Sequence, residues 1–188
     1  MNIEAAVAAI EAARTSGRLL DKLPPAVAPA TVAEGIAVQH ALAARRGHLP
    51  SAGFKIGATG SRMQAYLGIT EPAAGYMSEI SPSDTEFPNT IRPGVECELA
   101  VRLCHDLPPG PCTRAQAEVS VGALAAAIEL VENRTTDFTQ VGTPTLIADQ
   151  FFHRAAVIGD LVAARHAAGA VCSTSSRGPC SAPGRRSI

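Results

Sequence analysis

Two stretches of helical hydrophobic spacing open the chain. Residues 2–16 are rich in Ala, carry apolar side chains at intervals of three and four, and precede Gly17, a frequent helix stop. After a proline-rich segment, Thr31 and Glu34 have the spacing of a capping box, in which each side chain accepts a hydrogen bond from the backbone of the other residue. The pattern predicts a second helix from Thr31 to about Arg46. Both helices are interpreted as scaffolding.

A strict alternation of polar and apolar residues at 94–103 predicts a β-strand. Glu96 and Glu98 lie on its polar face, about 6.6–7 Å apart along the strand. Two carboxylates so placed repel each other unless water, a base or a metal ion compensates their charge. We therefore expect chemistry at this strand first. Its apolar face carries Val95, Cys97, Leu99, Val101 and Leu103.

The elements before this strand are predicted to be short. Residues 51–57 predict a strand that carries Lys55 between apolar neighbours, and Ser61 predicts the cap of a helix over 62–67. The stretch 69–93 contains four prolines and is predicted to be mostly loop. Long ordered loops of this kind also line active sites.

The region after the strand gives a mixed pattern. Thr113 predicts the start of a helix that runs to about Ala126. Residues 127–133 fit either a helix or a strand, 135–145 are predicted to form a polar loop, and 152–159 predict a further strand.

The hydrophobic pattern stops at about Asp160. No acidic residue follows Asp160, and Ser, Cys, Pro and Gly dominate the last part of the chain without helical or strand periodicity. Such a composition is typical of disorder, so 161–188 are predicted to be a disordered tail.

Composition narrows the function classes. With 188 residues, 46% of them hydrophobic, the chain can bury one substantial core, and that core is aliphatic because aromatics make up only 4%. The net charge of -1 gives no basic footprint for nucleic acid or anionic lipid. No secretory signal or membrane-spanning run is recognisable, and the five cysteines form no C-x-x-C pair. We therefore expect a reducing, cytoplasmic location.

Glutamates supply the candidate metal ligands. Glu96 and Glu98 on a rigid strand, together with Glu129 in an aliphatic run where a carboxylate needs a partner, suit a hard cation such as Mg²⁺ or Mn²⁺. Glu96 and Glu98 also fit a solvated strand face in which Arg102 pairs with Glu98, and their spacing alone favours that explanation. Glu129 also fits an exposed helix position.

Lys55 is a candidate general acid or base, and a lysine that reaches solvent along an apolar surface is the alternative. The sequence contains no nucleophile elbow, P-loop or dinucleotide motif, so acyl-serine, nucleotide and dinucleotide chemistry have no support. The histidines share no metal-ligand spacing and are interpreted as structural or exposed. They are His40, His48, His105, His153 and His166.

Five short motifs occur in a fixed order: Gly53-Phe-Lys-Ile-Gly-Ala-Thr59, Met63-Gln-Ala-Tyr-Leu-Gly68, Gly94-Val-Glu-Cys-Glu98, Ala127-Ile-Glu-Leu-Val-Glu-Asn-Arg134 and Leu146-Ile-Ala-Asp149. Each motif is weak alone, but the ordered set is specific. Over roughly residues 10–160, the series resembles the 2-keto-4-pentenoate hydratase family, which also holds 4-oxalocrotonate decarboxylases. That family belongs to the fumarylacetoacetate-hydrolase superfamily.

The resemblance implies an α+β fold, with an N-terminal helical region followed by an incomplete fumarylacetoacetate-hydrolase-like mixed β-roll. It implies Mg²⁺ or Mn²⁺ held by Glu96, Glu98 and Glu129. Lys55 and Glu79 match the positions implicated in proton transfer.

The resemblance implies a hydratase that adds water to 2-hydroxy-2,4-dienoates, such as 2-hydroxypenta-2,4-dienoate, in aromatic catabolism. A 4-oxalocrotonate-type decarboxylase is the alternative within the family, because both reactions use the same enolate stabilisation. The resemblance also places Glu132 and Asp149 next to the ligands. A homo-oligomer is expected from the family, with a subunit number that no residue specifies.

The resemblance divides the chain as well. Residues 1–50 correspond to the helical region and 51–160 to part of the catalytic domain, whereas 161–188 match nothing in the family. Relatives continue through further strands, so we expect a frameshift or premature end near Asp160 that leaves an unpaired sheet edge. A non-catalytic remnant, which at most binds metal or associates with an intact relative, is therefore a third alternative.

Overall fold

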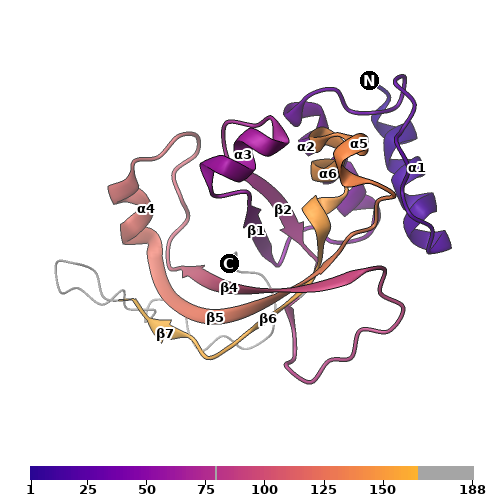
Figure 1. Cartoon of the computed structure of the whole chain (residues 1–188). Coiled ribbons are helices and arrows are strands. Elements are labelled where there is room, and N and C mark those ends of the chain that lie inside the picture. Colours follow the sequence, from indigo (N-terminus) through magenta and orange to yellow (C-terminus); the bar gives the residue numbers. More distant parts are fainter. Residues whose placement is uncertain (79, 165–188) are drawn as a thin grey trace.

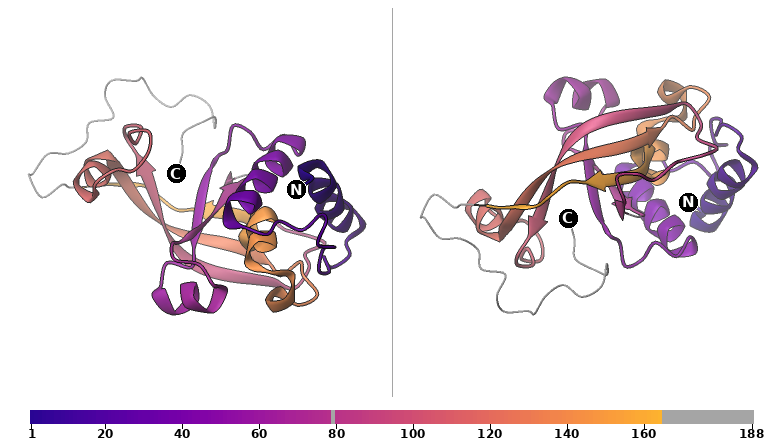
Figure 2. Two further views of the ribbon diagram at one scale, coloured as in Figure 1. Left: turned by 90° about the horizontal axis from the view of Figure 1, so that it is seen from above. Right: turned by 90° about the horizontal axis from the view of Figure 1, so that it is seen from below.

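The computed structural model describes residues 1–78 and 80–164, which form a mixed helix and sheet fold. A group of helices lies at one end of the molecule (Figure 1, Figure 2). Two long curved strands, β4 (Pro93–Leu103) and β5 (Val121–Glu132), extend from it toward helix α4 (Arg114–Ser120) at the other end. The predicted α+β class, with N-terminal helices and a mixed sheet, is confirmed.

The two N-terminal helices form as predicted. α1 spans Ile3–Ser16 and ends at Gly17, whose φ of 65° is the left-handed conformation that favours glycine. α2 spans Val32–Arg45 and begins at Thr31, which forms the expected capping box with Glu34. Local sequence signals therefore define both ends of α1 and the start of α2.

The tightest part of the core lies between α1, α2 and α6 (Thr143–Ala148). Apolar side chains of α1 and α2 meet the last residue of α6 there, beside two leucines that follow α1. Burial of these side chains drives the helices together. The cluster consists of Ala6, Val7, Ile10, Leu20, Leu23, Val38, Leu42 and Ala148, none more than 6% exposed.

Two sheets carry the strands. β1 (Gly53–Gly57) and β2 (Ala73–Met77) form an antiparallel pair. The larger sheet has the order β3-β6-β5-β4, and β7 pairs with the first residues of β5. Only β3 and β6 pair in parallel within it. The remaining elements are α3 Ser61–Leu67, β3 Ile80–Ser81, α5 Phe138–Val141, the 3-10 turn η1 Gln150–Phe152, β6 His153–Ile158 and β7 Val162–Ala163.

The register of β4 against β5 decides which glutamates meet. Glu96 lies opposite Glu129, and Glu98 lies opposite Ala127. The segment 127–133, which fitted helix or strand, is thus β5 up to Glu132. Within the described residues, β4 lies at the edge of the sheet.

The predicted helix from Thr113 to Ala126 is too long. α4 begins after the Thr113 capping box, but it ends at Ser120, and the Ala-rich residues that follow belong to β5. Backbone pairing with β4 outweighs the weak helix preference of a short Ala stretch. Gly122 also suits the strand, because a Cβ there would lie 2.8 Å from the Cβ of Cys104.

Two smaller predictions are wrong as well, and a third is incomplete. The predicted loop 135–145 contains α5 and the start of α6. The stretch 69–93 is mostly loop, as predicted, but it also contains β2 and β3. These elements are too short for a periodic signal. The N-cap of α3 is Gly60, without a side-chain hydrogen bond, rather than Ser61.

The predicted tail is only partly described. β7 lies just beyond Asp160 and pairs with β5, so ordered backbone continues past the end of the hydrophobic pattern. Residues 165–188 of the predicted tail lie outside the described residues. The boundaries of the predicted regions at 50 and 160 remain predictions. Across 1–78 and 80–164, no helix is both long and apolar enough to cross a membrane.

Candidate metal centre

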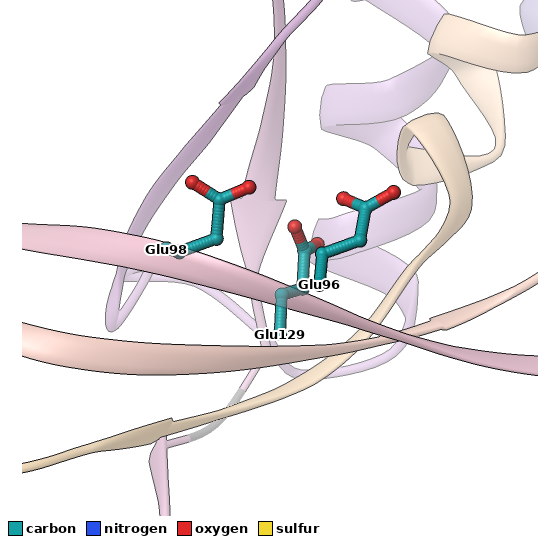
Figure 3. A group of neighbouring side chains, drawn as sticks. All are labelled: Glu96, Glu98 and Glu129. Atoms are coloured by element: carbon teal, nitrogen blue, oxygen red, sulfur yellow. The ribbon is translucent and has the colours of Figure 1, made fainter.

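Three glutamates meet on one face of the β4–β5 pair. Glu96 and Glu98 project from β4 and Glu129 from β5, all to the same side (Figure 3). One carboxylate oxygen of each residue lies within 4.8 Å of those of the other two. The register causes this, because Glu96 faces Glu129 directly and strand alternation returns Glu98 to the same face. The structure therefore brings together the three residues predicted as ligands.

The three glutamates differ in burial. Glu96 and Glu98 are exposed, whereas Glu129 is 5% exposed. In the described part of the chain, no ion pair joins Glu98 to Arg102. The alternative in which Arg102 neutralises Glu98 therefore has no support. Glu129 is not an exposed helix residue either, since it lies buried in a strand.

Glu129 has two partners that compensate its burial. Lys55 Nζ lies 3.2 Å from Oε2, and His153 Nδ1 lies 2.7 Å from Oε1. Burial alone would raise the pKa of Glu129, but the hydrogen bond to His153 and the charge of Lys55 outweigh it and lower that pKa. Glu129 is therefore an anion at neutral pH.

Lys55 is held in place by the strands and by an aromatic ring. Its side chain is 9% exposed, and Nζ lies 5.3 Å from the centroid of the Phe151 ring. Gly57 leaves room for this ring, because a Cβ there would lie 2.6 Å from a carbon of Phe151. Lys55 thus points into the molecule toward Glu129 rather than along the surface to solvent.

His153 is the residue that sequence reasoning missed. We interpreted it with the other histidines as structural or exposed, yet it is 3% exposed and contacts Glu129 directly. It is the first residue of β6, next to a register shift between β5 and β6. Only knowledge of that strand pairing could have placed it beside Glu129.

Glu132 and Asp149 belong to a separate buried network. Arg134 donates to Glu132 Oε2 at 3.1 Å and to Asp149 Oδ2 at 3.0 Å, while Arg14 of α1 donates to Asp149 Oδ1 at 2.6 Å. Arg134 also donates to the carbonyl oxygen of His153 at 3.1 Å. The network therefore joins α1 to the start of β6 and contacts the site through the carbonyl oxygen of His153.

Two arginines hold Asp149 ionised within this network. Burial alone would raise the pKa of Asp149, but the charges of Arg14 and Arg134 outweigh it and lower that pKa. Burial in turn lowers the pKa of Arg14. The network thus keeps several charges buried because each has a partner.

Glu79, predicted to take part in proton transfer, lies outside the described residues. Its place relative to Lys55 therefore remains a prediction.

A cavity of about 460 Å³ is lined by two of the three glutamates, Glu98 and Glu129. Apolar side chains make up most of the wall, and the polar side chains are those of Lys55, Glu98, Asp106, Glu129 and His153. A mostly apolar cavity of this size, with a few convergent polar groups, is typical of a small-molecule site.

The donor set fits a hard divalent cation. Three carboxylates and the Lys55 ammonium leave two negative charges, which a divalent cation would neutralise. One ion would need these oxygens closer together than the observed limit of 4.8 Å, and side-chain rotation of the exposed Glu96 and Glu98 could bring them closer.

Comparison with known proteins places the fold. No protein-family model matches the sequence. The structure of 4-oxalocrotonate decarboxylase from Pseudomonas putida G7 complexed with magnesium and adipate matches with a TM-score of 0.72 and 19% sequence identity, over 85% of this chain and 64% of that one. The same enzyme complexed with calcium and acetate matches with a TM-score of 0.65 and 16% identity, over 85% and 63%.

The chain therefore has the fold of 4-oxalocrotonate decarboxylase over most of its length. It spans 64% and 63% of the two enzyme chains, which is less than two thirds of either. The resemblance to the family that holds these decarboxylases is confirmed at the level of the fold.

Proposed function

We propose that the chain carries the metal site of a lyase that acts on 2-hydroxy-2,4-dienoates or their 2-oxo tautomers. The observation that supports this most directly is the cluster of Glu96, Glu98 and Glu129, with oxygens within 4.8 Å of one another, in a fold shared with 4-oxalocrotonate decarboxylase. The adjoining cavity of about 460 Å³ can hold a substrate of this size.

Glu96, Glu98 and Glu129 are proposed to hold Mg²⁺ or Mn²⁺. When bound, such an ion supplies positive charge that stabilises an anionic oxygen at C2 of the substrate. The solved complex of a protein of this fold with magnesium and adipate supports both a divalent cation and a small carboxylate ligand.

Lys55 is proposed to carry the proton that moves between the C2 oxygen and the substrate chain. Its Nζ lies 3.2 Å from Glu129 and lines the cavity, which is where a proton carrier must be. Glu79 is proposed as a second proton carrier, on the family resemblance alone. The apolar cavity wall would bind the hydrocarbon part of the substrate and keep bulk water away from it.

Hydration is the first candidate reaction. Water would add to the conjugated double bond of a 2-hydroxy-2,4-dienoate such as 2-hydroxypenta-2,4-dienoate, while Lys55 exchanges the proton required for ketonisation. Such a step belongs in aromatic catabolism. A cytoplasmic location and a homo-oligomer remain predictions.

Decarboxylation is the second candidate, and a specific observation favours it. Two solved structures that share this fold are of 4-oxalocrotonate decarboxylase, and one was complexed with the dicarboxylate adipate. A vinylogous oxo-diacid would lose carbon dioxide with the same stabilisation of charge at the C2 oxygen. The residues of the site fit either reaction.

A turnover assay with two substrates tests the proposal. The chain is incubated in Mg²⁺ with 2-hydroxypenta-2,4-dienoate or with 2-oxo-hex-3-enedioate, and hydrated product and carbon dioxide are measured separately. Hydrated product supports the hydratase, and carbon dioxide release supports the decarboxylase. EDTA and Glu96→Gln should abolish turnover, whereas the exposed control Glu71→Gln should leave it unchanged.

Two outcomes would contradict the enzyme proposal. Full turnover in EDTA by Glu96→Gln would show that the carboxylate cluster has no role. Metal binding without turnover of either substrate would favour the third alternative, a non-catalytic remnant.

A further inference from the structure

The carboxylate of Glu129 is held on both oxygens, by two different kinds of partner. Lys55 approaches Oε2 with a flexible ammonium group at 3.2 Å, and His153 approaches Oε1 with a planar ring nitrogen at 2.7 Å. An ammonium attracts a carboxylate from many directions, whereas a ring N–H fixes one direction. His153 is therefore the partner that can define the orientation of Glu129.

The contact at 2.7 Å is a hydrogen bond through His153 Nδ1. A carboxylate that holds a metal ion only accepts hydrogen bonds, so in the proposed site Nδ1 is the donor to Glu129. Nε2 is buried and has no hydrogen-bond partner within residues 1–78 and 80–164. The bond to Glu129 is thus the side-chain hydrogen bond that holds the ring in the described part of the chain.

The backbone before His153 is held in an unusual conformation. Gln150, Phe151 and Phe152 have φ values of 66°, 47° and 69°, in the left-handed region that residues other than glycine rarely adopt. Such residues persist only where the surrounding structure determines them. Phe151 packs beside Gly57, and Gln150 Oε1 accepts a hydrogen bond from the backbone N–H of Tyr76 at 2.8 Å.

The strained turn η1 is therefore anchored against β1 and β2, and it delivers His153 at the start of β6. Arg134 fixes the other side of the same residue through the His153 carbonyl at 3.1 Å. An apolar side chain at position 153 could fill the same space without burying an unpaired Nε2. Packing alone therefore does not explain a histidine at this position.

We propose that His153 is a positioning residue, which orients the Glu129 carboxylate toward the divalent cation by a hydrogen bond from Nδ1. The inference rests on the proposed metal site and adds a residue to it. Hydrogen-bond partners of metal ligands typically change metal affinity by about 10–100-fold when they are removed.

Three substitutions separate this role from simple packing. Asn carries its amide nitrogen near the place of the histidine Nδ1, Gln carries it near the place of Nε2, and Leu carries neither. His153→Asn can therefore keep the bond to Glu129, whereas His153→Gln and His153→Leu lose it. Circular dichroism and thermal unfolding identify which variants fold.

The readout is the dissociation constant of Mn²⁺, measured by electron paramagnetic resonance without substrate at fixed pH and ionic strength. We expect His153→Gln and His153→Leu to bind Mn²⁺ about 10–100-fold more weakly than the unmodified chain, and His153→Asn to stay within about threefold. If His153→Leu does not fold, the Mn²⁺ dissociation constants of His153→Asn and His153→Gln are compared with each other instead.

Two results overturn the inference while leaving the proposed metal site intact. One is unchanged Mn²⁺ affinity in a folded His153→Leu or His153→Gln variant. The other is an Asn variant as weak as the Gln variant. If the unmodified chain itself does not bind Mn²⁺, the proposed metal site fails first and this inference fails with it.

Discussion

The helical end of the molecule and the β4–β5 end are built in opposite ways. Between α1 and α2, Ile10 and Leu42 are fully buried, and apolar side chains close the space between the helices. On β4, by contrast, Val95 is 68% exposed and Leu99 is 63% exposed. Figure 2 shows the N-terminal helices at one end and the long strands extending away from them toward α4 at the other.

This difference assigns folding stability to the helical end of the molecule and the proposed metal ligands to the open strands. The helical end buries apolar surface, which stabilises the fold, and it contains the Arg14–Asp149–Arg134 network, in which each buried charge has a partner. The open strands carry Glu96 and Glu98, whose mutual repulsion opposes folding. Glu129, Lys55 and His153 lie where the two parts meet. Mutations should therefore affect either folding or metal binding, according to the part in which they lie.

The largest effect is expected at Arg134. Its substitution by Met would leave Glu132 and Asp149 buried without this partner, and breaking a buried charge network costs about 3–5 kcal/mol. Urea unfolding of Arg134→Met should show that loss of free energy. The control Arg114→Met removes a fully exposed pair with Glu118 and should leave stability nearly unchanged. Equal losses of unfolding free energy in the two variants would contradict the assignment of folding stability to the helical end.

A matched pair of leucines tests the same comparison in apolar residues. Leu42→Ala should cost about 2–5 kcal/mol of unfolding free energy, because it leaves a cavity in the buried helical core. Leu99→Ala should cost less than about 1 kcal/mol, since that side chain is 63% exposed. Thermal or urea unfolding of the two variants measures both values. A Leu99→Ala loss as large as that of Leu42→Ala would show that β4 is covered in solution.

Acid should weaken the helical end through Asp149. Because its pKa is lowered in the folded chain, Asp149 stabilises the fold above its unfolded pKa of about 3.9, and this contribution is lost as pH falls through the folded value. Asp149→Asn should be less stable at neutral pH, and the difference from the unmodified chain should shrink below about pH 4. Urea unfolding between pH 7 and pH 3 measures it. A constant difference across that range would contradict this assignment.

The smallest effect on folding is expected at Glu98. Without a divalent cation, Glu98→Gln should change stability by less than about 1 kcal/mol, with a slight gain because repulsion from Glu96 is relieved. Added Mg²⁺ should then raise the melting temperature of the unmodified chain more than that of the variant, because a ligand stabilises only the state that binds it. Identical shifts of the melting temperature in the two proteins would show that Glu98 does not take part in metal binding.

The sequence alone predicts the parts of the molecule that depend on local signals. The Gly17 stop, the Thr31 capping box and the alternation at 94–103 each act within a few residues, and the structure contains all three features. The end of α4 and the start of β5 depend on pairing with β4, which overrides local preference. That is why the helix predicted to reach Ala126 ends at Ser120.

The candidate site also combines features that follow from local sequence with features that depend on strand pairing. The placement of Glu96 and Glu98 on one strand face could be predicted from their spacing, and Lys55 could be named as a candidate from its apolar neighbours and the family resemblance. The contact of His153 with Glu129 depends on a turn of three left-handed residues and on a register shift between β5 and β6. Neither feature leaves a periodic trace in the sequence.

The most direct test of the account is a Mn²⁺ titration of the unmodified chain and of Glu96→Gln, followed by electron paramagnetic resonance, with unfolding measured on the same samples. We expect one bound ion in the unmodified chain and binding at least about 10-fold weaker in the variant, since removal of even a hydrogen-bond partner of a metal ligand weakens binding by about 10–100-fold. We also expect the metal-free stability of the two proteins to differ by less than about 1 kcal/mol. Equal Mn²⁺ affinity in both proteins, or no binding to the unmodified chain, would contradict the account.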